Sequence, residues 1–412
     1  MQETSKHAVG IDIGTNTVRC VVAHIDGTTG QPTIVGVGVS ANNGMRKGNV
    51  VNLAGPAQAI DDALGEAERM SGYQVDMATI SINGSHILST RADGMIAVSG
   101  AGHGITDDDL MRVEEVATVG KIPANREILE VIPHTYKLDG QDGIKNPIGM
   151  TGTRLEVDAN VVSVLSPHLV NLQKATEDAK VIPKSIIVSG VAAAKAVLSE
   201  NQLENGVALI DIGGATTNIA IYEEGDLQFV AVVPIGGNNI TNDLAIGLKT
   251  DPEIAEKLKI EHASAVVRSD ASGISLKSGE EIYNFNTSDM DEIVEARLEE
   301  LFELINKEFK RAGRAGNLPN GAVLTGGTAN MRGIVGYAKD SLGLAVRIGE
   351  IADYGGVADD IRKPQFATAI GLMLIDAENN SYSNQKSGNQ KSGRGPKNGG
   401  GKFAKFFSRF KI

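Results

Sequence analysis

Short apolar runs near the beginning of the chain predict β-strands. Residues 7–13, 18–25 and 32–39 are rich in valine and isoleucine, and polar or glycine-containing turns separate them. Runs bounded by turn residues are typical of strands joined by hairpins, so we expect a three-strand meander. Apolar positions at three- and four-residue spacing in residues 53–70 then predict a helix, and a strand follows at residues 78–82.

The pattern changes over residues 84–164. Short strands, a helical stretch that begins near Thr106 and a loop at residues 138–149 replace the regular alternation of long strands and helices. Beyond this segment the earlier pattern returns, with a helix at residues 167–179 and a strand at residues 185–188. We therefore expect residues 84–164 to form an inserted module.

The second half of the chain repeats the beginning. Residues 207–222 again read as a strand, a polar glycine turn and a strand, which suggests two related halves. The remaining expected elements are helices within residues 239–258, a β-rich segment at 263–285, a long helix at 289–311, a strand at 321–324 and a last helix at 366–377.

Two similar turns carry the candidate chemistry. Residues 12–15 read Asp-Ile-Gly-Thr and residues 211–214 read Asp-Ile-Gly-Gly, each directly after an apolar run. Such turns offer backbone N–H groups to phosphates, and Asp12 and Asp211 suit Mg²⁺ held through water. A third glycine turn at residues 324–329 leaves room for a nucleoside beside the backbone.

The ordered set of three turns favours a nucleotide site, although each turn alone is more often a structural turn. Gly237, in a further glycine-containing stretch, is added to the candidates. The nucleotide-binding candidates in the turns are Gly14, Thr15, Asn16 and Thr17, then Gly213, Gly214, Ala215 and Thr216, and finally Gly326, Gly327 and Thr328.

With these turns in this order, the chain resembles the actin/Hsp70/sugar-kinase ATPase superfamily. Within it, the chain is similar to the FtsA family of bacterial cell-division proteins over residues 7–377 and again in the tail. The stretches that carry the second resemblance are Pro-Ile-Gly-Met-Thr-Gly-Thr-Arg-Leu at 147–155, Pro-Ile-Gly-Gly-Asn-Asn-Ile-Thr-Asn-Asp at 234–243, Ala-Glu-Lys-Leu-Lys-Ile at 255–260 and Gln-Phe-Ala-Thr-Ala-Ile-Gly-Leu at 365–372.

The resemblance implies an α/β fold of the actin-like, duplicated ribonuclease H-like type, in which the inserted α+β module replaces the usual actin subdomain and lies elsewhere on the body. The implied division is 1–83, 165–204 and 364–378 for subdomain 1A; 84–164 for 1C; 205–238 and 312–363 for 2A; 239–311 for 2B; 379–401 for a disordered linker; and 402–412 for an amphipathic helix.

The resemblance also assigns roles to three charged residues. Glu256 and Lys259 are expected on the ribose and adenine side of ATP, whereas a solvated ion pair is the plainer interpretation of two residues three positions apart. Arg297 matches a family position implicated in contact with FtsZ, the tubulin-like ring protein. Alternatively, Arg297 is an exposed side chain whose role is to pair with Glu300 on the same helix.

Departures from the family pattern predict weak catalysis. Thr17 stands where relatives usually have a lysine near the phosphates, Ala215 replaces a glycine and Asn218 replaces an aspartate. Residues 188–192 contain no Glu or Gln to position an attacking water. Because binding and transition-state stabilisation are separate quantities, we expect ATP binding with slow or negligible turnover and no catalytic residue.

Charge divides the chain into two unlike parts. The formal net charge is −12, yet residues 379–412 carry eight Lys/Arg and no Asp/Glu, which leaves −20 on the rest. The acidic body argues against nucleic-acid binding. The single cysteine, Cys20, rules out a disulfide framework, and no secretory signal or membrane-spanning run is apparent, so we expect a cytoplasmic protein.

The C-terminal residues have the pattern of a membrane-surface helix. Within residues 402–412, the phenylalanines fall on one helical face and basic side chains flank or oppose them, as in helices that lie on anionic lipid. Docking on the protein's own core and binding in a partner's groove are the alternatives. The membrane-binding candidates are Phe403, Phe406, Phe407, Arg409, Phe410 and Lys411.

Together these features predict an ATP- and Mg²⁺-binding cell-division protein that forms actin-like filaments with itself. It would lie peripherally on the cytoplasmic face of the membrane at the division site, bind the FtsZ C-terminal peptide and other division proteins, and tether the FtsZ ring. An actin-like adaptor of a pilus or secretion machine is the first alternative. A small-molecule kinase is the second, although no motif places a base for a substrate hydroxyl.

Overall fold

Two five-stranded sheets form the framework of the molecule. The computed structural model describes residues 6–98, 104–266, 268, 272–357 and 361–388. In the first sheet the strand order is β11-β6-β1-β2-β3. Its strands are β1 (Lys6–Ile13), β2 (Thr17–Ile25), β3 (Pro32–Ala41), β6 (Met77–Ile82) and β11 (Ile182–Val188).

The second sheet repeats this arrangement. Its order, β18-β17-β12-β13-β14, matches the first sheet strand by strand: an antiparallel meander of three strands followed by two parallel strands. The predicted meander and the two related halves are therefore confirmed. The strands are β12 (Val207–Ile212), β13 (Thr217–Glu223), β14 (Asp226–Val233), β17 (Ala322–Thr325) and β18 (Val346–Ile348).

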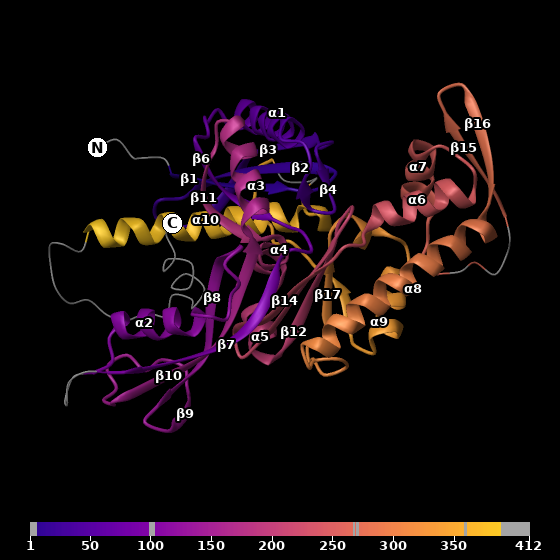
Figure 1. Cartoon of the computed structure of the whole chain (residues 1–412). Helices are drawn as coiled ribbons and strands as arrows, with labels where there is room; N and C mark the ends of the chain where they lie inside the picture. Colours follow the sequence, from indigo (N-terminus) through magenta and orange to yellow (C-terminus); the bar gives the residue numbers. More distant parts are fainter. Residues whose placement is uncertain (1–5, 99–103, 267, 269–271, 358–360, 389–412) are drawn as a thin grey trace.

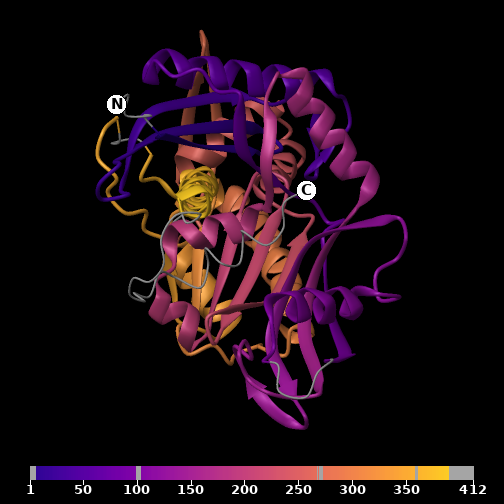
Figure 2. The same cartoon turned by 90° about the vertical axis from the view of Figure 1, so that its left-hand side faces the viewer.

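Two helices, α4 (Ser189–Val197) and α10 (Ala367–Gly388), lie between the sheets, and Figure 2 shows α10 end-on in this position. α10 packs on β1 and α4, and α4 packs in turn on β12 and β13. The fit is close, because a Cβ atom at Gly371 would lie 1.7 Å from the carbonyl oxygen of Ala192. The apolar residues of both elements join one buried core.

A buried carboxylate fixes α10 to the first sheet. Asp376, fully buried on α10, accepts hydrogen bonds from the backbone N–H of Val9, the hydroxyl of Thr79 and the ammonium of Lys184, each at 3.0 Å. Two residues later, Glu378 pairs with Lys195 of α4 at 2.6 Å. The part of α10 that contacts the sheet is therefore held by charge as well as by packing.

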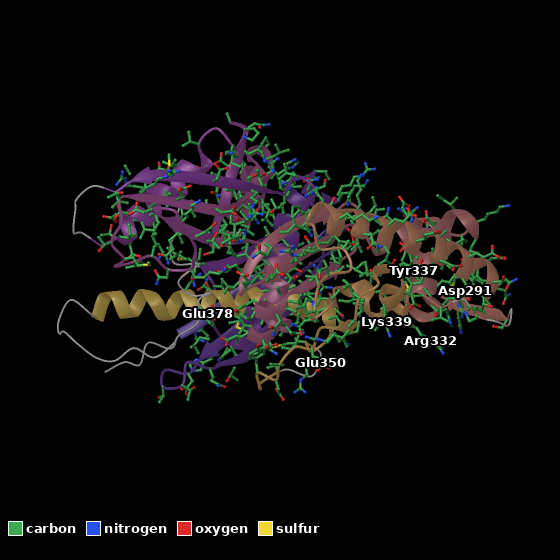
Figure 3. All side chains as sticks on the ribbon, turned by 90° about the horizontal axis from the view of Figure 1, so that it is seen from below. Asp291, Arg332, Tyr337, Lys339, Glu350 and Glu378 are labelled. Carbon is green, nitrogen blue, oxygen red and sulfur yellow. The ribbon has the colours of Figure 1, made fainter. Side chains whose placement is uncertain are left out.

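The last helix is longer than the sequence indicated. The sequence predicts its end at residue 377 and a linker from residue 379, whereas α10 continues to Gly388, so the start of the linker is corrected. Figure 3 labels Glu378, and beyond this residue the ribbon of α10 projects away from the body. Residues 389–401 of the predicted linker and the predicted helix at 402–412 lie outside the described residues.

The inserted module has its own sheet, with strand order β7-β10-β8-β9, and its own core. Helix α2 covers this sheet and begins with a capping box, in which Thr106 and Asp109 satisfy each other's backbone N–H groups. Strand β9 falls inside the predicted loop at 138–149. The elements are β7 (Leu88–Ala97), α2 (Asp107–Thr118), β8 (Arg126–Leu138), β9 (Gln141–Ile144) and β10 (Arg154–Leu165).

Helices and a hairpin extend the second sheet on the side away from the module (Figure 1). They share one core with that sheet, and the long helix α8 (Thr287–Arg311) supplies much of it. The other elements here are α6 (Gly237–Gly247), α7 (Pro252–His262), β15 (Gly273–Ser278), β16 (Glu281–Asn286), η1 (Gly327–Asn330) and α9 (Ile334–Leu342).

Shorter elements complete the fold around the first sheet, where helix α1 packs on β2 and β3. Among the helices of the described residues, none is both long and apolar enough to cross a membrane. The remaining elements are β4 (Met45–Arg46), β5 (Asn49–Val50), α1 (Ala54–Ser71), α3 (Ser166–Asp178), α5 (Glu200–Asn205) and η2 (Pro364–Phe366).

Candidate functional site

A cavity of about 1120 Å³ lies where the turns of the two halves face each other. It is bordered by the ends of β1, β12 and β17, which matches the general rule that ligands bind beyond the carboxyl ends of parallel strands. Ala215, which is buried, is the one nucleotide candidate absent from its wall. The candidates on the wall are Asp12, Gly14, Thr15, Asn16, Thr17, Asp211, Gly213, Gly214, Thr216, Gly237, Glu256, Lys259, Gly326, Gly327 and Thr328.

The two predicted phosphate turns have the same geometry. The backbone N–H of Gly14 donates to the carbonyl of Thr17 at 3.2 Å, and that of Gly213 donates to the carbonyl of Thr216 at 2.9 Å. The duplication seen in the sequence therefore extends to the hydrogen bonds within each hairpin.

The carboxylates at the two turns are buried and oriented by hydroxyl groups. Ser81, on β6, donates to Asp12 at 2.9 Å, and Thr325, on β17, donates to Asp211 at 3.4 Å. In both halves the hydroxyl comes from the parallel strand beside the hairpin. The pairing of strands distant in sequence thus positions each carboxylate.

Burial shifts the pKa values of these two carboxyl groups. It raises the pKa of Asp12, and it raises the pKa of Asp211 to about 6 with a further contribution from the charge of Asp12. The amide of Asn218 donates to Asp211 at 3.2 Å and opposes that rise. An aspartate at position 218 would instead add a third negative charge, so asparagine suits this buried position.

The third turn depends on glycine. Gly326 has a φ of +87°, and a Cβ atom there would lie 2.4 Å from the carbonyl oxygen of Ile212 and 2.6 Å from a carboxylate oxygen of Asp211. No side chain fits this space. The turn is thereby held directly against the end of β12, with Gly327 and Thr328 facing the cavity.

Glu256 and Lys259 form an ion pair that belongs to the cavity wall. Their charged atoms lie 2.6 Å apart, and the ammonium of Lys259 also donates to Thr241 at 2.9 Å and to the carbonyl of Gly237 at 3.2 Å. The side chain of Lys259 is only 12% exposed. The predicted pair therefore exists, and it is anchored to α6 rather than surrounded by solvent.

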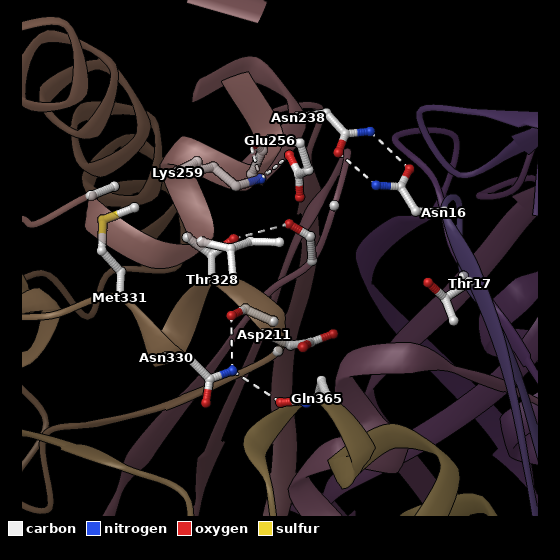
Figure 4. A pocket seen from close by; sticks show the side chains of 18 of the residues that line it. Asn16, Thr17, Asp211, Asn238, Glu256, Lys259, Thr328, Asn330, Met331 and Gln365 are labelled. Carbon is white, nitrogen blue, oxygen red and sulfur yellow. Dashed lines mark hydrogen bonds and ion pairs between the residues drawn. The ribbon is translucent and has the colours of Figure 1, made fainter. Parts of the chain in front are cut away.

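Two side-chain contacts join the halves across the cavity. The amides of Asn16 and Asn238 exchange hydrogen bonds of 2.6 and 2.8 Å, drawn as dashed lines in Figure 4. Asn83, at the end of β6, donates to the hydroxyl of Thr216 at 2.9 Å. These contacts hold the first phosphate turn close to the second turn and to the start of α6.

Sequence reasoning missed several residues of the wall. Asn238 directly follows Gly237, Asn330 directly follows the third turn, and Arg19 lies two positions after Thr17 on the same strand, so local spacing could have found them. Asn83 gave no such signal, because only the pairing of β6 with β1 brings it to the site. The other missed polar residues include Ser189, Arg332, Lys363, Gln365 and Thr368.

Arg297 is not an isolated surface charge. Its guanidinium binds both oxygens of Asp243 on α6, at 2.5 and 3.0 Å, and also pairs with Glu300 on its own helix. The ion pair with Glu300 agrees with the alternative that the sequence suggested for Arg297. The bond to Asp243 was not predicted. Arg297 is absent from the wall of the cavity.

Comparison with known proteins decides the family. A family model described as "Cell division protein FtsA" matches residues 208–371, and one described as "SHS2 domain inserted in FTSA" matches residues 84–163. The cell division protein FtsA of Pseudomonas aeruginosa is 34% identical, over 96% of this chain and 95% of that protein. This chain belongs to the FtsA family. FtsA of Bacillus subtilis is 35% identical over 92% and 86% of the two chains, and FtsA of Escherichia coli K12 is 31% identical over 90% and 91%.

Solved structures confirm the actin-like fold expected for an FtsA protein. A structure of the PilM–PilN type IV pilus biogenesis complex matches with a TM-score of 0.66 and 16% identity, over 90% of this chain and 98% of that chain. A structure of MreB5 of Spiroplasma citri bound to ADP matches with a TM-score of 0.53 and 13% identity, over 93% and 99%. At these identities the likeness concerns the fold alone. The expected inserted α+β module is confirmed as well.

Proposed function

We propose that this FtsA-family cell-division protein binds ATP and Mg²⁺ in the cavity between its halves. In the proposed function it assembles with itself into actin-like filaments on the cytoplasmic face of the membrane. Its C-terminal segment then tethers the FtsZ ring at the division site. The observation that carries the ATP assignment is the convergence of two duplicated glycine hairpins and a third glycine turn on one cavity.

The residues present fit a magnesium ion. Asp12 and Asp211 are buried and both line the cavity, and burial raises the pKa of each carboxyl group. Among the described residues no group of three metal-binding side chains occurs. Two carboxylates suit Mg²⁺, because this ion keeps several waters and takes its other ligands from phosphates. Mg²⁺ would then offset the negative charges of the triphosphate and the two carboxylates.

We expect ATP turnover to be slow. Of residues 188–192, only Ser189 reaches the cavity wall, and its hydroxyl donates to the carbonyl of Ile82 at 3.4 Å. A serine held in this way is a poor base for activating water. ATP would then act chiefly by holding the two halves together, in the closed shape that assembles.

Titration calorimetry of the full-length chain with ATP tests the nucleotide assignment. We expect binding that is stronger with Mg²⁺ than with a chelator, and Asp211→Asn should lose most of that difference, roughly tenfold in affinity. Asp142→Asn, which removes an exposed carboxylate outside the cavity, is the matched control and should bind as the unaltered protein does. Absence of binding by the unaltered protein under both conditions would refute the proposal.

The interactions with membrane and ring protein are supported by the family and by the sequence of the tail. The basic, phenylalanine-rich residues 402–412 favour an anionic lipid surface. Arg297 is proposed to contact the FtsZ C-terminal peptide, and other division proteins would bind elsewhere on the chain. The pilus-adaptor and kinase alternatives are less favoured, because the extensive sequence matches are to cell-division proteins whereas the pilus protein shares only the fold.

A further inference from the structure

Arg19 places a positive charge on the cavity wall that forms no ion pair within the described residues. It lies on β2, two residues after Thr17, and both side chains line the cavity, as expected for alternate positions on one face of a strand. Within the described chain no hydrogen bond or ion pair engages its half-buried guanidinium. Its Cζ lies over the ring of Phe366, 5.5 Å from the ring centre. A guanidinium has five N–H donors, so its capacity to bind an anion is unused.

Two other cations on the cavity wall are already engaged. Lys259 is bound to Glu256 at 2.6 Å, and Arg268 is bound to Asp291 at 2.5 Å. Arg19, in contrast, faces Asp12 across the β1–β2 hairpin without forming an ion pair with it. This register places its guanidinium beside the turn predicted to hold the phosphates.

A triphosphate with Mg²⁺ still carries net negative charge, and two carboxylates in the same cavity increase the need for a cation. Figure 4 shows Thr17 on the same side of the cavity as Asn16 and opposite Lys259. A cation two positions along the same face of β2 would reach the same wall.

On the basis of the proposed ATP function, we propose that Arg19 binds the phosphates of the nucleotide. Arginine suits this task, because its planar fork can donate two parallel hydrogen bonds to one phosphate. Arg19 should not contribute to the affinity for the nucleoside part of the ligand.

The test compares the affinities for ATP and adenosine of the full-length chain and its variants, by calorimetry with Mg²⁺. Arg19→Gln should bind ATP roughly 10- to 100-fold more weakly and adenosine within about twofold of the unaltered protein. Adding Thr17→Lys to Arg19→Gln should restore roughly tenfold of the ATP affinity. Arg69→Gln removes a cation from helix α1, outside the cavity, and should change neither affinity.

Two results would overturn the assignment: ATP affinity unchanged in Arg19→Gln, or ATP and adenosine affinities reduced equally. Should Arg19→Gln fail to fold, Arg19→Lys serves in its place, because it keeps the charge and loses the fork. It should weaken ATP several-fold more than adenosine, and equal weakening counts against the proposal. If the unaltered protein binds no ATP, the proposed function itself fails; if it binds ATP and the variants do not discriminate, only the role of Arg19 fails.

Discussion

At the scale of single residues, buried polar groups in this protein mostly occur with a partner that the chain supplies from far away. Asp12 depends on Ser81, and Asp376 depends on Thr79 and Lys184. Glu130, a partly buried residue on β8 of the inserted module, differs. Among the described residues no hydrogen bond or ion pair engages its carboxylate, and burial raises its pKa to about 8.

Glu130 should therefore make stability depend on pH. Its pKa in the folded protein, about 8, exceeds the ordinary value of 4.5, so between these values the folded state binds more protons than the unfolded state. Stability should then fall as pH rises through this window. Glu130→Gln should remove the decline and raise the free energy of unfolding at pH 7 by about 1–3 kcal/mol.

Denaturant unfolding at several pH values measures this effect. Glu127→Gln is the matched control, because Glu127 lies on the same strand and is exposed, and it should leave the pH dependence unchanged. The interpretation fails if Glu130→Gln and the unaltered protein lose stability in parallel as the pH rises.

The same scale shows which site residues a sequence can reveal. Gly14, Gly213 and Gly326 were found because a turn that needs glycine can be recognised from a few consecutive residues. Arg19 was missed although it lies two positions after Thr17, since attention fell on the glycine turn and not on the apolar strand that follows it. Asn83 required knowledge of which strands pair, and that information is non-local.

At the scale of elements, most strands and helices follow from the spacing of apolar residues. The meander, α1, α3 and α8 were all predicted close to their observed limits, because each buries one regular face. The end of α10 was not, since residues 379–388 are polar and carry no apolar period. Such a segment can continue a helix already nucleated by the packing of its first turns.

Helix α8 permits a matched test of partner binding. Arg297 and Arg311 both lie on this helix and both pair with acidic residues, and Arg297 also reaches Asp243. If Arg297 contacts FtsZ, Arg297→Ala should weaken binding of the FtsZ C-terminal peptide roughly tenfold, because arginines are common binding hot spots. Arg311→Ala should have little effect.

Fluorescence anisotropy with a labelled peptide measures both variants. Comparable affinities for Arg297→Ala and the unaltered protein would assign the residue a purely structural role beside α6. Equal losses in the two variants would indicate a general effect of charge rather than a contact.

At the scale of the whole molecule, the duplication predicted from two short motifs describes both sheets and their shared cavity. The relative placement of the halves could not be predicted, because contacts such as Asn16 with Asn238 join residues remote in sequence. The position of the inserted module likewise came from the resemblance, and the structure then supplied its contacts with the second sheet.

The division between an acidic body and a basic tail yields a prediction for the whole chain. Deleting residues 402–412 should abolish binding to vesicles of anionic lipid, because the phenylalanines and basic residues act together there. ATP affinity should stay the same, since the cavity lies in the body. Co-sedimentation with vesicles measures the first quantity and calorimetry the second.

Vesicles of neutral lipid are the control, and the full-length chain should bind them more weakly than anionic ones. Undiminished sedimentation of the deleted chain with anionic vesicles would place the membrane contact elsewhere on the protein.

The continuation of α10 beyond Glu378 bears on where the tail would leave the body. Residues 379–388 add about 15 Å of helix at 1.5 Å per residue, continuous with the part of α10 that packs inside the core. The core packing of α10 therefore fixes the departure point of the tail on each subunit, at the end of a helix that projects from the body. Residues 389–401, predicted from the sequence as a linker, would add their own reach beyond that point.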